Sequence, residues 1–429
     1  MKKAYIKTFG CQMNVHDSEK MAGILRAQGF DLTEDRQNAD LIIFNTCSIR
    51  QKAEQKFLSE LGRTRRMKER RPALRVAVAG CIAQQMGEKL LKRAPHVDYL
   101  FGPQNLHALT GVSEKESLLA LEENPGLATM ELPVLRKERG RAWVSIMYGC
   151  DNFCSYCIVP YTRGRERSRP SESIVSEVRA LAAEGFREVT LLGQNVNSYR
   201  SDVDFPGLLR RLNGVDGLAR IRFVTSHPKD FSPELVDALA GLEKPCEHVH
   251  LPLQSGSTRV LREMNRKYTR EEYLKKVQAL RARVPGVAIT TDIITGFPGE
   301  REEDHRDTLG VLGEVQFDGI FAFAFSPRPG TRAAAMQGHL PDAVRSARLA
   351  EVLELQDSIT LGKNEALTGT TTEVLVEGPG EALPGQLTGR TRTNKIVTFQ
   401  GGEDLEGTLL DVRIVRARRH SLEGEVLSS

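Results

Sequence analysis

Long hydrophobic runs are absent from this sequence. Nowhere in its 429 residues do roughly 18 apolar residues occur together, which is the length that a membrane-spanning helix needs. The N-terminal residues Met1-Lys2-Lys3 lead directly into a strand pattern instead of an apolar secretory core. These two absences favour neither membrane insertion nor export, so we expect a cytoplasmic protein with no membrane partner.

The sequence also lacks a large excess of either charge, and its number of cysteines is not even. The formal net charge is only +4, and the seven cysteines are an odd number in a long chain without a signal peptide. Such cysteines favour metal ligation or catalysis over a disulfide framework. Hydrophobic residues at 40% and charged residues at 27% are typical of a globular protein, and the length predicts roughly two to four domains.

Three of the cysteines form one compact run. Cys150, Cys154 and Cys157 lie in the stretch Gly149-Cys150-Asp151-Asn152-Phe153-Cys154-Ser155-Tyr156-Cys157, with no fourth cysteine nearby. A fully ligated cubic iron–sulfur cluster needs four thiolates, so three predict a cluster with one iron left open for chemistry. The alternative is a structural zinc site, which ordinarily closes four ligands.

Strand and helix patterns alternate up to about residue 125, which predicts an open parallel sheet with helical crossovers. The expected strands are Lys3–Gly10, Leu41–Thr46 and Arg75–Gly80, and the expected helices are Asp17–Gln28 and a basic helix from about Gln51. Cys11, Cys47 and Cys81 each follow one of these strands. Because the carboxyl ends of such strands meet at one edge of the sheet, the three thiols should converge there and bind a metal. Taken singly, each is better explained as a buried small hydrophobe, but three at equivalent strand ends favour metal binding.

A linker is expected from Asn124-Pro125-Gly126 through Arg136-Lys137-Glu138-Arg139-Gly140. Beyond it, strand and helix patterns alternate in larger units. The clearest helix is Glu172–Glu184, and the expected strands are Trp143–Met147, Glu188–Gly193, Ile221–Thr225, His248–Leu253, Val287–Ile294 and Ile320–Phe325. Six such units are two short of a closed eight-fold barrel, so we expect an open or partial barrel.

The ends of these later strands carry polar or glycine-containing stretches. They are Gly193-Gln194-Asn195, Ser226-His227-Pro228, Gln254-Ser255-Gly256-Ser257 and Thr295-Gly296-Phe297-Pro298-Gly299-Glu300. Glycine lets a backbone approach a ligand closely, and amides or hydroxyls satisfy its polar groups. Any one stretch alone is an ordinary turn, but four at one face predict a cosubstrate pocket beside the cysteine run. Cys246 precedes its strand and is expected to be structural, while His227 and His250 fit either a pocket or a satisfied buried position.

From about Gly369 the chain changes to short strand patterns with glycine-rich turns, over Thr372–Glu377, Lys395–Phe399 and Thr408–Ala417. This pattern predicts a small antiparallel barrel of the kind that grips nucleic-acid backbone, with a dimerisation or lid module as the alternative. Basic stretches at Arg63–Arg71 and Arg413–His420 are the places where phosphates could bind.

Taken together, these motifs resemble one family. Gly10-Cys11-Gln12-Met13-Asn14, Asn45-Thr46-Cys47-Ser48-Ile49-Arg50, Gly80-Cys81 and the stretch from Gly149 to Pro170 are similar to the methylthiotransferases of the radical S-adenosylmethionine superfamily. The resemblance covers nearly the whole chain. It implies an α/β protein with an N-terminal cluster domain (an open parallel α/β sheet, residues 1–125), a central partial (β/α)6 radical S-adenosylmethionine barrel (136–366) and a C-terminal antiparallel TRAM barrel (367–429) that binds RNA.

The resemblance also implies the cofactors. Cys150, Cys154 and Cys157 would hold the [4Fe-4S] cluster that generates a radical from S-adenosylmethionine, and Cys11, Cys47 and Cys81 would hold a second [4Fe-4S] cluster that carries or presents sulfur. Two S-adenosylmethionine molecules would be used per turnover, one as methyl donor and one as radical source. The pocket residues Gly193, Gln194, Asn195, Gln254 and Gly296 would contact the cosubstrate. The sequence does not identify a catalytic side chain.

The expected substrate is an adenosine next to the anticodon of tRNA, methylthiolated at carbon 2. Gln12-Met13-Asn14 and the stretch Ile158–Pro170 look most like members of the family that act on N6-isopentenyladenosine. Relatives that modify threonylcarbamoyl-adenosine or a ribosomal-protein aspartate are the alternatives. Further partners implied are an external electron donor, such as flavodoxin or ferredoxin, and a sulfur source.

A different class of function also fits two clusters, namely a non-catalytic electron carrier or a redox-sensing RNA-binding protein. Ferredoxin-type carriers close all four ligands of a cluster, whereas each set of cysteines here is one ligand short. The sequence therefore favours an enzyme.

Overall fold

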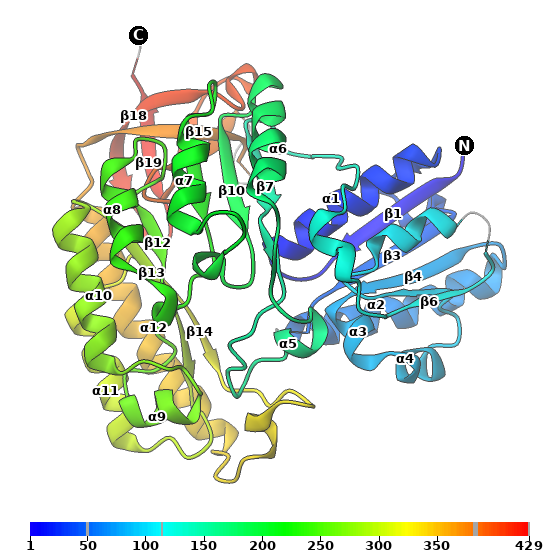
Figure 1. The fold of residues 1–429 in the computed structure, drawn as a ribbon, viewed down its shortest axis with the longest axis horizontal. Helices are drawn as coiled ribbons and strands as arrows, with labels where there is room; N and C mark the ends of the chain where they lie inside the picture. Colours follow the sequence, from blue (N-terminus) through cyan, green and yellow to red (C-terminus); the bar gives the residue numbers. More distant parts are fainter. Residues whose placement is uncertain (49–50, 113–114, 381–384, 428–429) are drawn as a thin grey trace. The chain divides into compact units, whose positions relative to one another are not determined.

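The computed structural model describes residues 1–48, 51–112, 115–380 and 385–427 (Figure 1). Its contacts divide the chain into two compact units: 1–137 with 147–151 and 158–169, and 138–146 with 152–157 and 170–429. Among the described residues, no helix is both long enough and apolar enough to cross a membrane.

The N-terminal unit is built on a parallel sheet in the order β2-β1-β3-β4-β5-β6 (Figure 1). The strands are β1 (Lys3–Thr8), β2 (Asp31–Leu32), β3 (Leu41–Thr46), β4 (Arg75–Gly80), β5 (Tyr99–Phe101) and β6 (Leu118–Ala120). The helices are α1 (Gln12–Ala27), α2 (Gln51–Arg70), α3 (Cys81–Met86) and α4 (Glu88–Arg93). The open parallel sheet predicted from the sequence is confirmed.

Two hydrophobic cores cover the two faces of this sheet. Met21 and Ile43 belong to one core, and Phe44 and Phe57 belong to the other. Neighbouring residues of β3 thus point to opposite cores, and all six residues of this strand are buried. Burial on both faces explains why parallel strands read as continuous apolar runs.

The first helix differs from its predicted bounds. The prediction placed its start at Asp17, but α1 begins at Gln12, and β1 ends at Thr8 instead of Gly10. The first turns of α1 bury Asn14, Asp17 and Lys20. Because these buried side chains are polar, an apolar periodicity could not reveal that part of the helix.

The second unit contains the six expected barrel strands, in two parallel three-stranded sheets ordered β11-β10-β7 and β12-β13-β14. Their bounds are β7 (Arg141–Ser145), β10 (Glu188–Leu192), β11 (Arg220–Phe223), β12 (His248–His250), β13 (Ala288–Thr295) and β14 (Gly319–Ala324). The connecting helices are α6 (Ser171–Ala183), α7 (Phe205–Asn213), α8 (Pro233–Gly241), α9 (Thr258–Glu263), α10 (Arg270–Arg283), α11 (Glu302–Val315) and α12 (Asp342–Glu365). A bridge between Ile221 and Pro245 links the edges of the two sheets.

The chain ends in a closed barrel ordered β15-β16-β17-β19-β18. Its strands are β15 (Thr371–Pro379), β16 (Gln386–Thr391), β17 (Ile396–Gln400), β18 (Leu409–Ala417) and β19 (Leu422–Val426). The predicted small barrel is confirmed, although β17 and β19 pair in parallel and all its other neighbours are antiparallel. Sequence patterns did not reveal β16 or β19, whose glycines weaken the alternation of strand residues.

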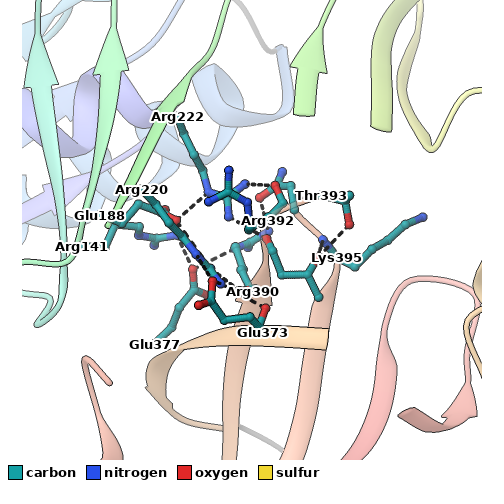
Figure 2. A network of polar contacts seen from close by, with 12 residues as sticks. Arg141, Glu188, Arg220, Arg222, Glu373, Glu377, Arg390, Arg392, Thr393 and Lys395 are labelled. Atoms are coloured by element: carbon teal, nitrogen blue, oxygen red, sulfur yellow. Dashed lines mark hydrogen bonds and ion pairs between the residues drawn. The ribbon is translucent and has the colours of Figure 1, made fainter. Parts of the chain in front are cut away.

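Two arginines of β11 join the C-terminal barrel to the central one (Figure 2). Arg220 is fully buried and donates to the carbonyl oxygens of Glu373 and Arg390, at 3.0 and 2.8 Å, and to the Glu373 carboxylate at 2.7 Å. Arg222 donates to the carbonyl oxygens of Arg392 and Thr391, at 2.8 and 2.6 Å. Arg220 is the first residue of β11, so the C-terminal barrel contacts this strand at its amino end, opposite the carboxyl edge.

This junction makes Arg220 a test of how the two barrels depend on each other. Arg220→Ala removes a buried cation from beside Glu188 and leaves carbonyl oxygens without donors, which costs about 3 kcal/mol. We expect the thermal unfolding midpoint to fall by roughly 5–10 °C. Arg210→Ala, at an exposed arginine of α7, is the matched control. Equal midpoints for the two variants would contradict the junction's contribution to stability.

Candidate cluster and cosubstrate sites

The structure places the N-terminal cysteines at one edge of the parallel sheet. Cys47 and Cys81 directly follow β3 and β4, which are neighbours, and Cys11 immediately precedes α1 beyond β1, the other neighbour of β3. Gly10 has φ +145°, and a side chain there would place its first carbon 2.6 Å from the Cβ of Cys47. Only glycine permits the two cysteine loops to approach this closely.

The surroundings of Cys11 lower the pKa of its thiol. The pKa of the Cys11 thiol is lowered to about 6, mainly by a hydrogen bond with Cys47. Burial raises this pKa, and the positive charge of Arg163 lowers it further. A lowered pKa favours the thiolate, which is the form that binds metals. Cys11 is therefore chemically suited to ligation.

Buried amides fix the loops that carry the thiols. The side chain of Asn14 donates to the Oδ1 of Asn45 at 3.1 Å and to the carbonyl of Thr46 at 3.0 Å, and Asn45 donates back to the carbonyl of Asn14 at 2.7 Å. Asn14 and Asn45, which belong to the sequence motifs, therefore have a structural role in these loops. Ile49 and Arg50 of the second motif lie outside the described residues.

Among the described residues, no three His, Cys, Asp or Glu side chains gather closely enough to hold one metal ion. A cubic cluster needs a different arrangement, because each thiolate binds a different iron. The three cysteines fit such a cluster, because they lie on loops after neighbouring strands and Cys11 contacts Cys47.

The compact cysteine run is divided between the two units. Cys150 belongs to the N-terminal unit, where its amide donates to the Gly164 carbonyl at 3.1 Å. Cys154 and Cys157 belong to the second unit and are joined by a turn in which the Cys157 amide donates to the Cys154 carbonyl at 2.9 Å. Phe153 just before them has φ +46°, a conformation uncommon for a bulky residue.

Arg266 contacts one of these thiols and was not expected from the sequence. Its guanidinium donates to the Cys154 Sγ at 3.3 Å, to the Pro252 carbonyl at 3.0 Å and to the Tyr268 hydroxyl at 2.9 Å. Burial alone would lower the pKa of Arg266, but Tyr156, Tyr268 and Cys154 raise it well above its usual value. The arginine therefore keeps its positive charge beside the thiol.

Four predicted pocket side chains have buried polar atoms that are unused within the described part of the chain. They are the Gln194 amide, the Oδ1 of Asn195, the Ser226 hydroxyl and the Nε2 of His227. Nδ1 of His227 accepts a hydrogen bond from the Lys229 amide at 3.1 Å, so Nε2 carries the proton of the neutral ring. Burial and the charge of Arg266 lower the pKa of His227 to about 2, which keeps the ring neutral.

Leaving such atoms buried and unpaired is costly, and a bound polar molecule would satisfy them. Gln194 follows β10, and Ser226 and His227 follow β11, at the carboxyl edge of neighbouring strands. The donors and acceptors present therefore fit a cosubstrate rich in polar groups, such as S-adenosylmethionine.

Internal contacts occupy other groups of the predicted pocket residues. The Nδ2 of Asn195 donates to Asp230 at 2.7 Å, and Gln254, with φ +73°, pairs through its backbone with β13. Gly296 has φ +68° and lies against the side chain of Arg345, and Gly193 is buried at the end of β10. These four shape the strand ends.

The remaining ambiguous residues are resolved by their surroundings. Cys246 is 2% exposed, and burial raises the pKa of its thiol to about 11, which suits a structural residue. Nδ1 of His250 lies 3.0 Å from the Thr290 hydroxyl, and its Nε2 lies 3.5 Å from Asp292.

Comparison with known proteins identifies the parts of the chain. The Radical SAM superfamily matches residues 144–312, the TRAM domain matches 365–427, and the uncharacterized protein family UPF0004 matches 3–102. Over 99% of both chains, the sequence is 54% identical to the tRNA-2-methylthio-N(6)-dimethylallyladenosine synthase of Thermodesulfovibrio yellowstonii. It is 51% identical to the synthase of the same name from Moorella thermoacetica, over 98% of each chain. The chain belongs to this family of methylthiotransferases.

Solved structures support the fold of this methylthiotransferase. The radical S-adenosylmethionine methyltransferase TsrM from Kitasatospora setae matches with a TM-score of 0.55 at 15% identity, covering 90% of this chain and 81% of TsrM. The cobalamin-dependent radical enzyme OxsB matches with a TM-score of 0.55 at 12% identity, covering 83% of this chain and 56% of OxsB. At these identities the similarity concerns the fold alone.

Gln194 offers a direct test of the cosubstrate pocket. Gln194→Ala removes two polar atoms available to a ligand, and losing about 1.4 kcal/mol of hydrogen bonding weakens binding tenfold. We expect a roughly tenfold higher Kd for S-adenosylmethionine by equilibrium binding, with unchanged iron content. Gln278→Ala, on the exposed face of α10, serves as control. Unchanged affinity in Gln194→Ala would remove this residue from the pocket.

Proposed function

We propose that this protein converts N6-isopentenyladenosine, next to the anticodon of tRNA, to its 2-methylthio derivative in the cytoplasm. The proposal rests on 54% sequence identity, over 99% of the chain, to a synthase named for this type of product. The presence of both three-cysteine sets supports it. The named relatives favour this substrate over threonylcarbamoyl-adenosine or a ribosomal-protein aspartate, and they favour an enzyme over an electron carrier.

The chemistry explains why two cysteine sets are needed. Carbon 2 of adenine has no acidic proton, so a base cannot activate its C–H bond. When bound, a [4Fe-4S] cluster with an open iron would supply reductive radical chemistry with S-adenosylmethionine, which can remove this hydrogen, and a second cluster would supply the sulfur. Cys150, Cys154 and Cys157 would hold the first cluster, and Cys11, Cys47 and Cys81 the second.

The protein's own groups bind and orient the reactants. The Gln194 amide and the neutral His227 ring would receive the polar groups of S-adenosylmethionine, since both have buried atoms without a partner among the described residues. Arg266 would hold the Cys154 sulfur in place. One S-adenosylmethionine would serve as methyl donor and another as radical source, and the electrons would come from a flavodoxin or ferredoxin.

The C-terminal barrel is the proposed binding site for tRNA. On β18, Val412 and Ile414 point into the barrel core, while Arg413 is exposed on the outer face. Arg416 and Arg418 are 68% and 57% exposed, although both lie near Glu423. Phosphates bind such exposed arginines readily. By contrast, Arg390 and Arg392 of the junction are paired with Glu377 and Glu247, so they contribute less to an RNA surface.

Single cysteine replacements separate the two proposed clusters. Cys47→Ala should lower the iron content toward half, abolish methylthiolation and leave cleavage of S-adenosylmethionine intact, because the radical-generating set is unchanged. Cys154→Ala should abolish both reactions. Iron analysis, release of 5′-deoxyadenosine and nucleoside mass spectrometry measure the three outcomes.

Cys246→Ala is the matched control for these replacements, since Cys246 is equally buried but belongs to neither set. Its iron content should equal that of the unmodified protein. If Cys47→Ala still methylthiolates RNA, the assignment of a second cluster is wrong.

The substrate is tested with three anticodon-loop RNAs that carry plain, isopentenylated or threonylcarbamoylated adenosine. An isopentenyl group contributes ~0.8 kcal/mol for each apolar carbon that it buries, so plain adenosine should lose roughly 2–4 kcal/mol, or about 30- to 1,000-fold in kcat/KM. A threonylcarbamoyl group would bring a carboxylate into an apolar pocket at a desolvation cost. Mass spectrometry of the digested nucleosides measures the products.

Preferential modification of the threonylcarbamoyl RNA would assign the protein to the sister activity. Modification of a ribosomal protein, with none of the three RNAs changed, would overturn the proposal that RNA is the substrate.

A further inference from the structure

A buried arginine lies beside the N-terminal thiols, on a segment distant from them in sequence. Residues 158–169 belong to the N-terminal unit although they directly follow Cys157. Their short helix, α5 (Val159–Thr162), packs against α3, which begins with Cys81. Arg163 directly follows α5 and is only 6% exposed.

The position of Arg163 is fixed from several sides. Its guanidinium donates to Asp17 Oδ2 at 2.9 Å, and both side chains are almost fully buried. Its carbonyl oxygen accepts a hydrogen bond from the Gln104 amide at 3.1 Å. Gly164 has φ +76°, and a side chain there would approach the same amide to 2.5 Å. The guanidinium is therefore held in one place.

The contacts of Arg163 lead to the elements that carry two of the thiols. Asp17, its ion-pair partner, lies on α1, which begins directly after Cys11, and α5 packs against α3, which begins with Cys81. The charge of Arg163 interacts with the thiols of both Cys81 and Cys11. Asp17 already balances this buried cation, and the thiolates that bind a cluster would add further negative charge close to it.

An iron–sulfur cluster held by three thiolates carries a net negative charge, and its reduction adds one more electron. A fixed positive charge in a buried environment stabilises the reduced form more than the oxidised form, because screening by water is weak there. We propose that Arg163 compensates the charge of the cluster on Cys11, Cys47 and Cys81 and raises its reduction potential. This inference rests on the proposed function, which places a cluster on these cysteines.

The test uses the full-length chain with Cys150, Cys154 and Cys157 replaced by alanine, so that only the N-terminal set binds iron. After reconstitution, the cluster is reduced stepwise with dithionite and followed by electron paramagnetic resonance. Arg163→Gln should give a more negative potential, whereas Arg163→Lys, which keeps the charge, should lie closer to the parent. Asp17→Asn removes the opposing carboxylate and should shift the potential in the positive direction.

Two further variants separate charge from packing. Arg163→Gln combined with Asp17→Asn avoids an unpaired buried carboxylate, and its potential should lie between those of Arg163→Gln and the parent. Arg266→Gln removes an equally buried arginine that contacts the other cysteine set, so it should leave this potential unchanged.

The outcomes are distinguishable. Full iron content with the same potential in Arg163→Gln and in the double variant would overturn the charge role of Arg163. A loss of iron in every Arg163 variant, including lysine, with no shift in the residual cluster would make it a packing residue only. If the parent chain binds no iron at the N-terminal set, the two-cluster function itself fails.

Discussion

The shared carboxyl edge of parallel strands is the constraint on which both candidate sites depend. In the N-terminal sheet, β1, β3 and β4 are neighbours, so the loops after them bring Cys11, Cys47 and Cys81 to one edge. In the central barrel, the same rule gathers the ends of β10 and β11, which present Gln194 and His227. Parallel pairing thus converts residues far apart in sequence into local chemistry.

Positions fixed by this rule could be predicted from the sequence. Cys47 and Cys81 directly follow their strands as expected, because β3 and β4 are short apolar runs with clear ends. The six strands of the central barrel and three of the five strands of the C-terminal barrel also follow from local patterns. Recognition of the cysteine spacing, and not periodicity, was needed to connect these elements to methylthiotransferase chemistry.

Positions fixed by long-range pairing could not be predicted. No sequence pattern indicated that Arg163, Arg220 and Arg266 are buried, yet all three are, and each has partners from distant segments. The start of α1 was missed for a related reason, since its buried face is polar. A hydrophobic pattern detects apolar burial only, and a buried charge becomes recognisable once its partner is known.

The junction between the two barrels of the second unit relies in large part on backbone carbonyl oxygens. Arg220 and Arg222 supply side chains, whereas much of what they bind in the C-terminal barrel is backbone, namely the carbonyl oxygens of Glu373, Arg390, Thr391 and Arg392 (Figure 2). Every residue type offers a carbonyl oxygen. Sequence change at Arg390 and Thr391 is therefore compatible with these contacts as long as the path of the backbone is kept. Arg392 is different, because its own side chain donates to Glu247 and to the carbonyl oxygens of Glu243 and Pro245. RNA preference can thus diversify on the barrel surface while Arg220, Arg222 and Arg392 keep the attachment.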